Sequence, residues 1–123
     1  MLTGFCDDVP ALLPSIDVFA LGSYHEPFGR VVIESMAAGC ITIGTRAGGV
    51  PEIIDDGVDG VLYEARDVDG LVACLRRVLS LSSAERDALR AAAREKVRTR
   101  FGMNRFMQEM LATYREVLAE RGA

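Results

Sequence analysis

The chain has 123 residues, of which 50% are hydrophobic and 26% are charged, and its formal net charge is −4. This length suits one domain with a hydrophobic core. The acidic balance argues against nucleic acid or an anionic membrane as the main partner. We find no apolar run that could span a bilayer and no basic-then-apolar leader before the domain, so we expect a cytoplasmic protein.

Short apolar runs alternate with helical patterns along the chain. In chain order, we predict a helix at 9–13, a strand at 17–21, a loop at 22–28, a helix at 29–38, a strand at 41–44, a short helix at 50–55, a strand at 61–63, and helices at 68–79, 83–100 and 103–120. This alternation predicts an α/β fold, a partial Rossmann-like parallel sheet with flanking helices and a helical C-terminus.

Capping and apolar patterns refine these elements. Asp7 or Asp8 is expected to cap the first helix, and Ser82 or Ser83 the helix at 83–100. Gly39 is placed to end the helix at 29–38. One side of the helix at 68–79 is expected to face the core, through Leu71, Val72, Leu75, Val78 and Leu79.

The three cysteines are widely spaced and odd in number, which argues against a disulfide framework or a structural zinc site. They are Cys6, Cys40 and Cys74. Cys40 opens an apolar strand, so we expect it to be a buried free thiol.

The most informative stretch lies between Glu26 and Glu52. Ligands of open α/β sheets bind beyond the carboxyl ends of the strands, where the loop 22–28 lies. The helix that begins near Gly29 presents unpaired N–H groups there, which favours an anion. Glu34 lies roughly 7.5 Å along the helix axis from Gly29, and Glu26 lies in the loop on the other side. Two carboxylates around a diphosphate-sized position suit a ligand with hydroxyls at both ends, such as a nucleotide-sugar.

Simpler roles for the same residues stay open. Glu34 follows Arg30 by four positions and could form a surface ion pair worth a few tenths of a kcal/mol. Glu26 could favour the helix N-terminus electrostatically. Gly48 and Gly49 could be ordinary turn residues.

Three segments together resemble the signature of the family 4 glycosyltransferases. They read Ser23-x-x-Glu26-Pro-Phe-Gly29, Glu34-Ser-Met-Ala-Ala-Gly39 and Gly48-Gly49-Val-Pro51-Glu52-Ile-Ile, and the match covers roughly residues 1–100. These are retaining enzymes with the two-domain GT-B fold. The resemblance implies half of a GT-B donor domain and transfer of a sugar from a nucleoside-diphosphate-sugar to an acceptor.

The resemblance also implies roles for individual positions. Glu26 matches the glutamate that contacts hydroxyls of the donor sugar, and its implied catalytic role is to stabilise charge during front-face displacement. Glu34 matches the glutamate that binds the ribose hydroxyls. The remaining donor-binding positions, which act through backbone groups or a small polar side chain, are Phe28, Gly29, Arg30, Val31 and Ser23. The family needs no metal, so we expect no cofactor besides the donor substrate.

Some family features find no match in this sequence. We find no basic Arg…Lys pair before Glu26, no base-contacting segment and no acceptor-binding domain. We therefore expect residues 1–123 to form a single partial donor-binding domain, the second half of the family's C-terminal domain. A separate N-terminal chain is then a possible partner.

Three other features have a plain and a functional interpretation. Asp67-Val68-Asp69 mimics a metal-binding Asp-x-Asp motif, but helix capping explains it better. The arginines of the helix at 83–100 could touch a membrane surface peripherally, although interleaved acidic residues favour a solvated face. The last helix has an apolar side that invites a partner or self-association, formed by Phe106, Met110, Tyr114, Val117 and Leu118.

Three hypotheses follow from the sequence. The first is the donor-binding portion of a retaining glycosyltransferase. The second is a truncated or split chain without activity of its own, which works only beside a separate N-terminal chain. The third is a non-catalytic scaffold that dimerises through its last helix.

Overall fold

A three-stranded parallel sheet forms the centre of the fold, in the order β1 (Val18–Ala20), β2 (Ile41–Thr45) and β3 (Val61–Tyr63). The computed structural model describes residue 2 and residues 4–122. The helical elements are α1 (Val9–Leu12), the 3₁₀ turn η1 (Leu13–Ser15), α2 (Arg30–Ala38), α3 (Val50–Ile53), α4 (Val68–Ser80), α5 (Ser83–Arg100) and α6 (Met103–Gly122). The predicted α/β architecture is confirmed.

Helices cover both faces of the sheet, which is why every residue of β2 and β3 is buried. Residues of α2 and α3 pack with Leu62 on one face, and residues of α4 pack with Ile41, Ile43 and Val61 on the other. Buried hydroxyls join α2 to β2, because Ser35 Oγ lies 2.8 Å from Thr42 Oγ1. The core therefore lies in two layers, one on each side of the sheet.

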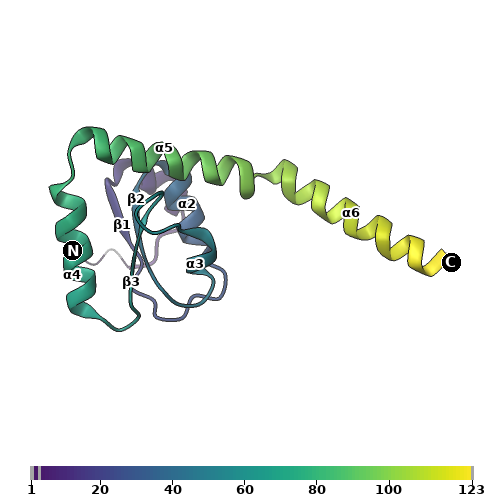
Figure 1. Ribbon diagram of the computed structural model, residues 1–123, viewed down its shortest axis with the longest axis horizontal. Coiled ribbons are helices and arrows are strands. Elements are labelled where there is room, and N and C mark those ends of the chain that lie inside the picture. Colours follow the sequence, from purple (N-terminus) through teal and green to yellow (C-terminus); the bar gives the residue numbers. More distant parts are fainter. Residues whose placement is uncertain (1, 3, 123) are drawn as a thin grey trace.

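The helix α5 runs across the amino ends of the strands (Figure 1). Its Arg90 bonds Asp17 just before β1, and its Lys96 bonds Asp59 just before β3. The α2–β2 turn at Gly39 lies against Arg94, also on α5. The opposite edge of the sheet, where the strands end, is left to loops.

The helix α6 continues beyond α5 and extends away from the sheet (Figure 1). Most of its apolar side is exposed, with Phe106 57% and Leu118 69% exposed. Within the described residues, no helix is both long enough and apolar enough to cross a membrane.

The predicted caps are present. Asp8 caps α1, and Ser82 forms a reciprocal capping box with Glu85 at the start of α5. Gly39 ends α2 with φ of 89°, a left-handed conformation that suits glycine. Cys40 is buried and free, as predicted, and burial raises the pKa of its thiol.

Two sequence predictions about the elements are wrong in part. The short helix at 50–55 ends at Ile53, because Ile54 is extended and the Asp55 amide donates to Asp59 Oδ1 at 2.8 Å. On α4, Val72 is 38% and Leu79 66% exposed, so they do not belong to the buried side. Each follows a packed residue by one position, and one residue is a rotation of about 100° around a helix.

Candidate functional site

The loop 22–28 lies at the carboxyl end of β1, beside the ends of β2 and β3. Two hydrogen bonds from the neighbouring strands fix its first part. The Tyr63 hydroxyl donates to the Leu21 carbonyl at 3.0 Å, and the Thr45 hydroxyl donates to the Ser23 carbonyl at 2.8 Å. Burial raises the pKa of the Tyr63 phenol, so it stays a protonated donor. The loop therefore starts from a fixed position on the sheet.

The glycine pair after β2 packs directly against the second part of this loop. The Gly49 amide donates to the Glu26 carbonyl at 2.9 Å. A Cβ atom on Gly49 would lie 2.6 Å from the Pro27 carbonyl oxygen, and one on Gly48 would collide with the Glu26 carbonyl oxygen. The two glycines are thus more than turn residues, because only the absence of side chains lets the two loops approach so closely.

The helix α2 starts where these loops meet. Gly29 is its N-cap and has φ of 70°, and a Cβ there would lie 2.9 Å from Ile53 Cδ1. The Gly29 amide is directed at Glu26 Oε1, and the Val32 amide donates to the Gly29 carbonyl at 2.9 Å. In the described part of the chain, this leaves the amides of Arg30 and Val31 as the free donors of the first turn.

Both predicted carboxylates lie at this helix start, and each makes a contact within the chain. Glu26 Oε1 accepts a long hydrogen bond of 3.3 Å from the Gly29 amide. Glu34 Oε1 lies 3.0 Å from Arg30 Nε, in an ion pair whose side chains are 28% and 85% exposed. These are the simpler roles that the sequence left open. An exposed pair of this kind contributes about 0–1 kcal/mol, so a ligand can exchange with it readily.

The other predicted donor-binding positions surround the same helix start. Phe28 is 70% exposed, and the Arg30 side chain points to solvent. The Val31 side chain packs against the core, which leaves its backbone for a ligand. Ser23 lies just after the strand, where its carbonyl is already bonded to Thr45. The structure thus brings Glu26, Gly29, Arg30 and Glu34 together at the start of α2, whereas the hydrogen bond of Ser23 is with β2.

The Asp-x-Asp sequence has the capping role that was expected. Asp67 caps α4 through a hydrogen bond of 2.9 Å from the Gly70 amide to its Oδ1. Among the described residues, no group of three or more His, Cys, Asp or Glu side chains could hold a metal ion.

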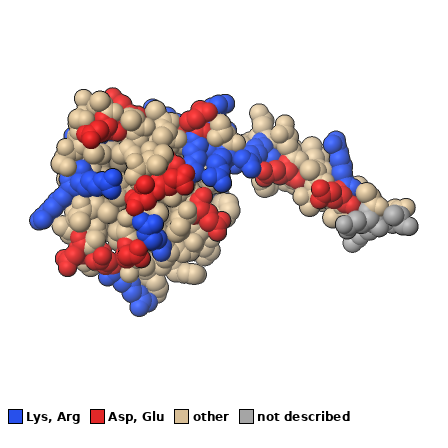
Figure 2. Space-filling model, in the orientation of Figure 1, with Lys and Arg blue, Asp and Glu red and all other residues tan. Residues whose placement is uncertain are grey.

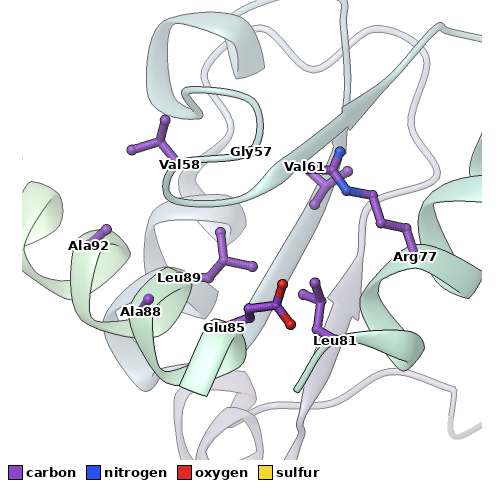
Figure 3. A pocket seen from close by; sticks show the side chains of 9 residues that line it. All are labelled: Gly57, Val58, Val61, Arg77, Leu81, Glu85, Ala88, Leu89 and Ala92. Carbon is purple, nitrogen blue, oxygen red and sulfur yellow. The ribbon is translucent and has the colours of Figure 1, made fainter. Parts of the chain in front are cut away.

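Two hollows lie in different parts of the molecule. One of about 200 Å³ adjoins the loop 22–28 and is lined in part by Pro27, Phe28 and Gly49. Another of about 430 Å³ lies between α4, α5 and the turn at Gly57, where Arg77 and Glu85 reach in from opposite sides (Figure 3). The second hollow contains none of the predicted site residues, and the first contains Phe28 but neither Glu26 nor Glu34. The candidate site is therefore the surface around the start of α2 and not either of these hollows.

Charges of both signs are interspersed over the face of the molecule shown in Figure 2. Along α5, Arg90 pairs with Asp17 at 3.1 Å and Arg98 with Glu95. Arg98 is 72% exposed, in keeping with the solvated face that the sequence favoured, whereas Arg90 is 24% exposed and belongs to the packed side of α5.

One contact at the site was not predicted from the sequence. The Arg66 guanidinium carbon lies 4.6 Å from the centre of the Tyr24 ring, which joins the β3–α4 loop to the loop 22–28. Arg66 has φ of 68°, a conformation that is rare for residues other than glycine. No local sequence signal announces this contact, since the two residues are far apart in the chain.

Known proteins share both the sequence and the fold of this chain. Residues 1–96 match the profile of the family described as Glycosyl transferases group 1. The N-acetyl-alpha-D-glucosaminyl L-malate synthase of Bacillus anthracis is 34% identical over 120 residues, which cover 98% of this chain and 31% of that protein. The D-inositol 3-phosphate glycosyltransferase of Salinispora tropica is 33% identical over 114 residues, or 93% of this chain and 23% of that protein.

Solved structures of glycosyltransferases superpose closely on the fold. A glycosyltransferase from Rickettsia africae gives a TM-score of 0.90 at 28% identity, covering 96% of this chain and 32% of that one. Anabaena HepE in complex with UDP gives a TM-score of 0.87 at 27% identity, covering 93% of this chain and 31% of that one. The chain therefore spans about a quarter to a third of the length of these relatives, and it belongs to the Glycosyl transferases group 1 family.

Proposed function

We propose that this chain is the donor-binding portion of a retaining family 4 glycosyltransferase, the second half of its donor domain. The observation that carries this proposal is that both carboxylates contact the start of α2, Glu26 at the Gly29 amide and Glu34 at the Arg30 side chain. The ligand class is supported by structures of the related Anabaena HepE, which were solved with UDP, with UDP and glucose, and with UDP-glucose.

In this proposal each end of the site recognises a different part of the donor. Glu34 accepts hydrogen bonds from the ribose hydroxyls after releasing Arg30. The amides of Arg30 and Val31 face the diphosphate, as helix N-termini commonly do. Glu26 accepts hydrogen bonds from the sugar hydroxyls, while Phe28 and Gly29 line the sugar. The close approach of a ligand at Gly29 is possible because that residue has no side chain.

The proposed reaction keeps the configuration of the sugar. The acceptor oxygen forms a bond to the anomeric carbon on the face from which the diphosphate departs, and the bond from that carbon to the diphosphate oxygen breaks. The acceptor proton passes to the departing phosphate. Glu26 stabilises the positive charge that develops on the sugar. We propose no metal for this chemistry, and the cytoplasmic location stays a prediction.

Calorimetry with UDP, GDP and their glucose and mannose conjugates tests the donor site. We expect one of these compounds to bind the wild-type chain and Glu34→Ala to lose at least about tenfold in affinity, as expected when a charged hydrogen-bonding group is removed. Glu95→Ala is the matched control, since it breaks another exposed pair of the same kind, with Arg98. Equal binding by wild type and Glu34→Ala would sink the proposal.

A second candidate is a binding module that transfers sugar only beside a further chain or domain. It is favoured by the coverage of 23% and 31% of the two relatives described above. Under this proposal the 123-residue chain binds donor but does not turn it over. Sustained sugar transfer by the purified chain alone would exclude this candidate.

A further inference from the structure

Arg66 occupies a backbone position that favours glycine. Its φ of 68° is the single positive value among the non-glycine residues that the structure describes. A side chain in this left-handed conformation is strained, because its Cβ comes close to the backbone. Asp67, which follows, already supplies the cap of α4, so Arg66 is not needed to start the helix. Another interaction of the Arg66 side chain therefore accounts for arginine at this position.

The contact that Arg66 makes is with the loop 22–28. Its guanidinium carbon lies 4.6 Å from the centre of the Tyr24 ring, within the range of a cation–π interaction. Tyr24 is 57% exposed, so surrounding side chains do not hold its ring. An open hollow of about 180 Å³ adjoins the pair and is lined by Gly22, Tyr63 and Leu71 besides the stacked residues. The ring therefore has space to turn if the guanidinium is removed.

We propose that Arg66 is a positioning residue for Glu26, acting through Tyr24; this inference rests on the donor site proposed above. The backbone of the loop is fixed at the Ser23 carbonyl by Thr45 and at the Glu26 carbonyl by Gly49. Tyr24 lies between these two points, and Arg66 fixes its side chain. The stack thereby limits rotation of the segment that carries the Glu26 carboxylate.

This role predicts opposite effects on stability and on binding. Replacing Arg66 with glycine relieves the backbone strain, because glycine adopts positive φ freely. The same change frees the Tyr24 ring, whereas the hydrogen bonds from Thr45 and Gly49 still hold the backbone of the loop, so the expected loss of affinity is small. A residue that only supported the fold would lower stability and binding together, so the two measurements separate the roles.

Two measurements on the full 123-residue chain test the proposal on four variants: thermal unfolding, and calorimetry with whichever glucose or mannose conjugate of UDP or GDP binds the wild type. They are Arg66→Gly, Arg66→Lys, Tyr24→Leu and the double variant Arg66→Gly/Tyr24→Leu. We expect Arg66→Gly to unfold at the wild-type temperature or above it, and to bind about three- to fivefold more weakly, the loss of one exposed stack. Arg66→Lys keeps the cation and restores most of the affinity. The double variant binds no more weakly than either single variant, because both changes remove one contact.

Four outcomes would overturn the inference. Binding by Arg66→Gly at wild-type affinity, or losses that add up in the double variant, would remove Arg66 from the donor site while leaving the proposed function in place. A parallel fall in unfolding temperature and affinity would make Arg66 merely structural. Failure of the wild-type chain to bind any of the nucleotide-sugars would overturn the proposed function and this inference together.

Discussion

A buried ion cluster joins α5 to the turn before β3, and its disruption gives a sharp test of the packing. Lys96 Nζ lies 2.8 Å from Asp59 Oδ2 and 2.9 Å from Asp55 Oδ2. The side chains of Lys96 and Asp59 are 8% and 4% exposed, whereas Asp55 is 62% exposed. Asp59 Oδ1 also accepts the Asp55 amide at 2.8 Å, so one carboxylate organises the whole turn.

We expect Lys96→Met to destabilise the chain strongly. Methionine retains most of the apolar stem but removes the cation, which leaves the Asp59 carboxylate buried and unpaired. Removing one partner of a buried pair costs about 3–5 kcal/mol of the free energy of unfolding. That is a large share of the roughly 5–15 kcal/mol by which domains are stable. Adding Asp59→Asn removes the unpaired charge and keeps an oxygen for the Asp55 amide, so the double variant should regain part of the loss.

Urea unfolding followed by far-ultraviolet circular dichroism measures these differences. Arg98→Ala is the control, because it breaks the exposed pair with Glu95 and should change stability by less than about 1 kcal/mol. The reasoning is refuted if Lys96→Met loses no more stability than Arg98→Ala. It is also refuted if the double variant shows the sum of the two single losses, since residues in one buried network should not act independently.

Three further predictions concern the contact between the loops, the loss of stability at acid pH and the exposed side of α6. Gly49→Ala should lose about 1–3 kcal/mol of the free energy of unfolding in urea, because its Cβ would meet a carbonyl oxygen of the loop 22–28. Gly22→Ala is the control: no atom lies within 4 Å of its Cβ, so it should change stability by no more than about 0.5 kcal/mol. The hydrogen bond from Lys96 lowers the pKa of Asp55 below its ordinary 3.8, so this group stabilises the fold above that pH and the contribution is lost as the pH falls further. Asp55→Asn should therefore flatten the fall in urea midpoint below about pH 4. The exposed side of α6 predicts concentration-dependent association in light scattering, which Phe106→Glu with Leu118→Glu should abolish.

Much of the fold could be predicted from local patterns. The strands are short apolar runs that end at glycine or a polar residue, and the caps at Asp8, Ser82 and Gly39 are signals within one turn of each helix. The predicted strand at 17–21 exceeds the observed β1 by one residue at each end. Even there the ladder continues, because the Ile41 amide donates to the Asp17 carbonyl and the Leu21 amide donates to the Ile43 carbonyl, each at 2.9 Å.

The rest depends on which distant segments meet, and a local pattern carries no such information. The helical pattern of α4 shows an apolar side, but not how much of it the sheet covers. The glycine pair could be read as a turn until the loop 22–28 is seen against it. The Arg66–Tyr24 stack and the Lys96–Asp59 pair join residues 42 and 37 positions apart, so neither could be predicted from spacing.

The candidate site combines a firmly held backbone with loosely held carboxylates. The loop 22–28 is fixed by hydrogen bonds from Thr45 and Gly49 at 2.8 and 2.9 Å and by the close approach of two glycines, and Tyr63 holds Leu21 just before it at 3.0 Å. By contrast, Glu26 has a bond of 3.3 Å, and the exposed partner of Glu34 contributes about 1 kcal/mol at most. Micromolar binding releases about 8 kcal/mol, several times the value of both contacts. A ligand that offers hydroxyls to both carboxylates can thus replace these contacts without rearranging the backbone, which is the preorganisation that the proposed donor site requires.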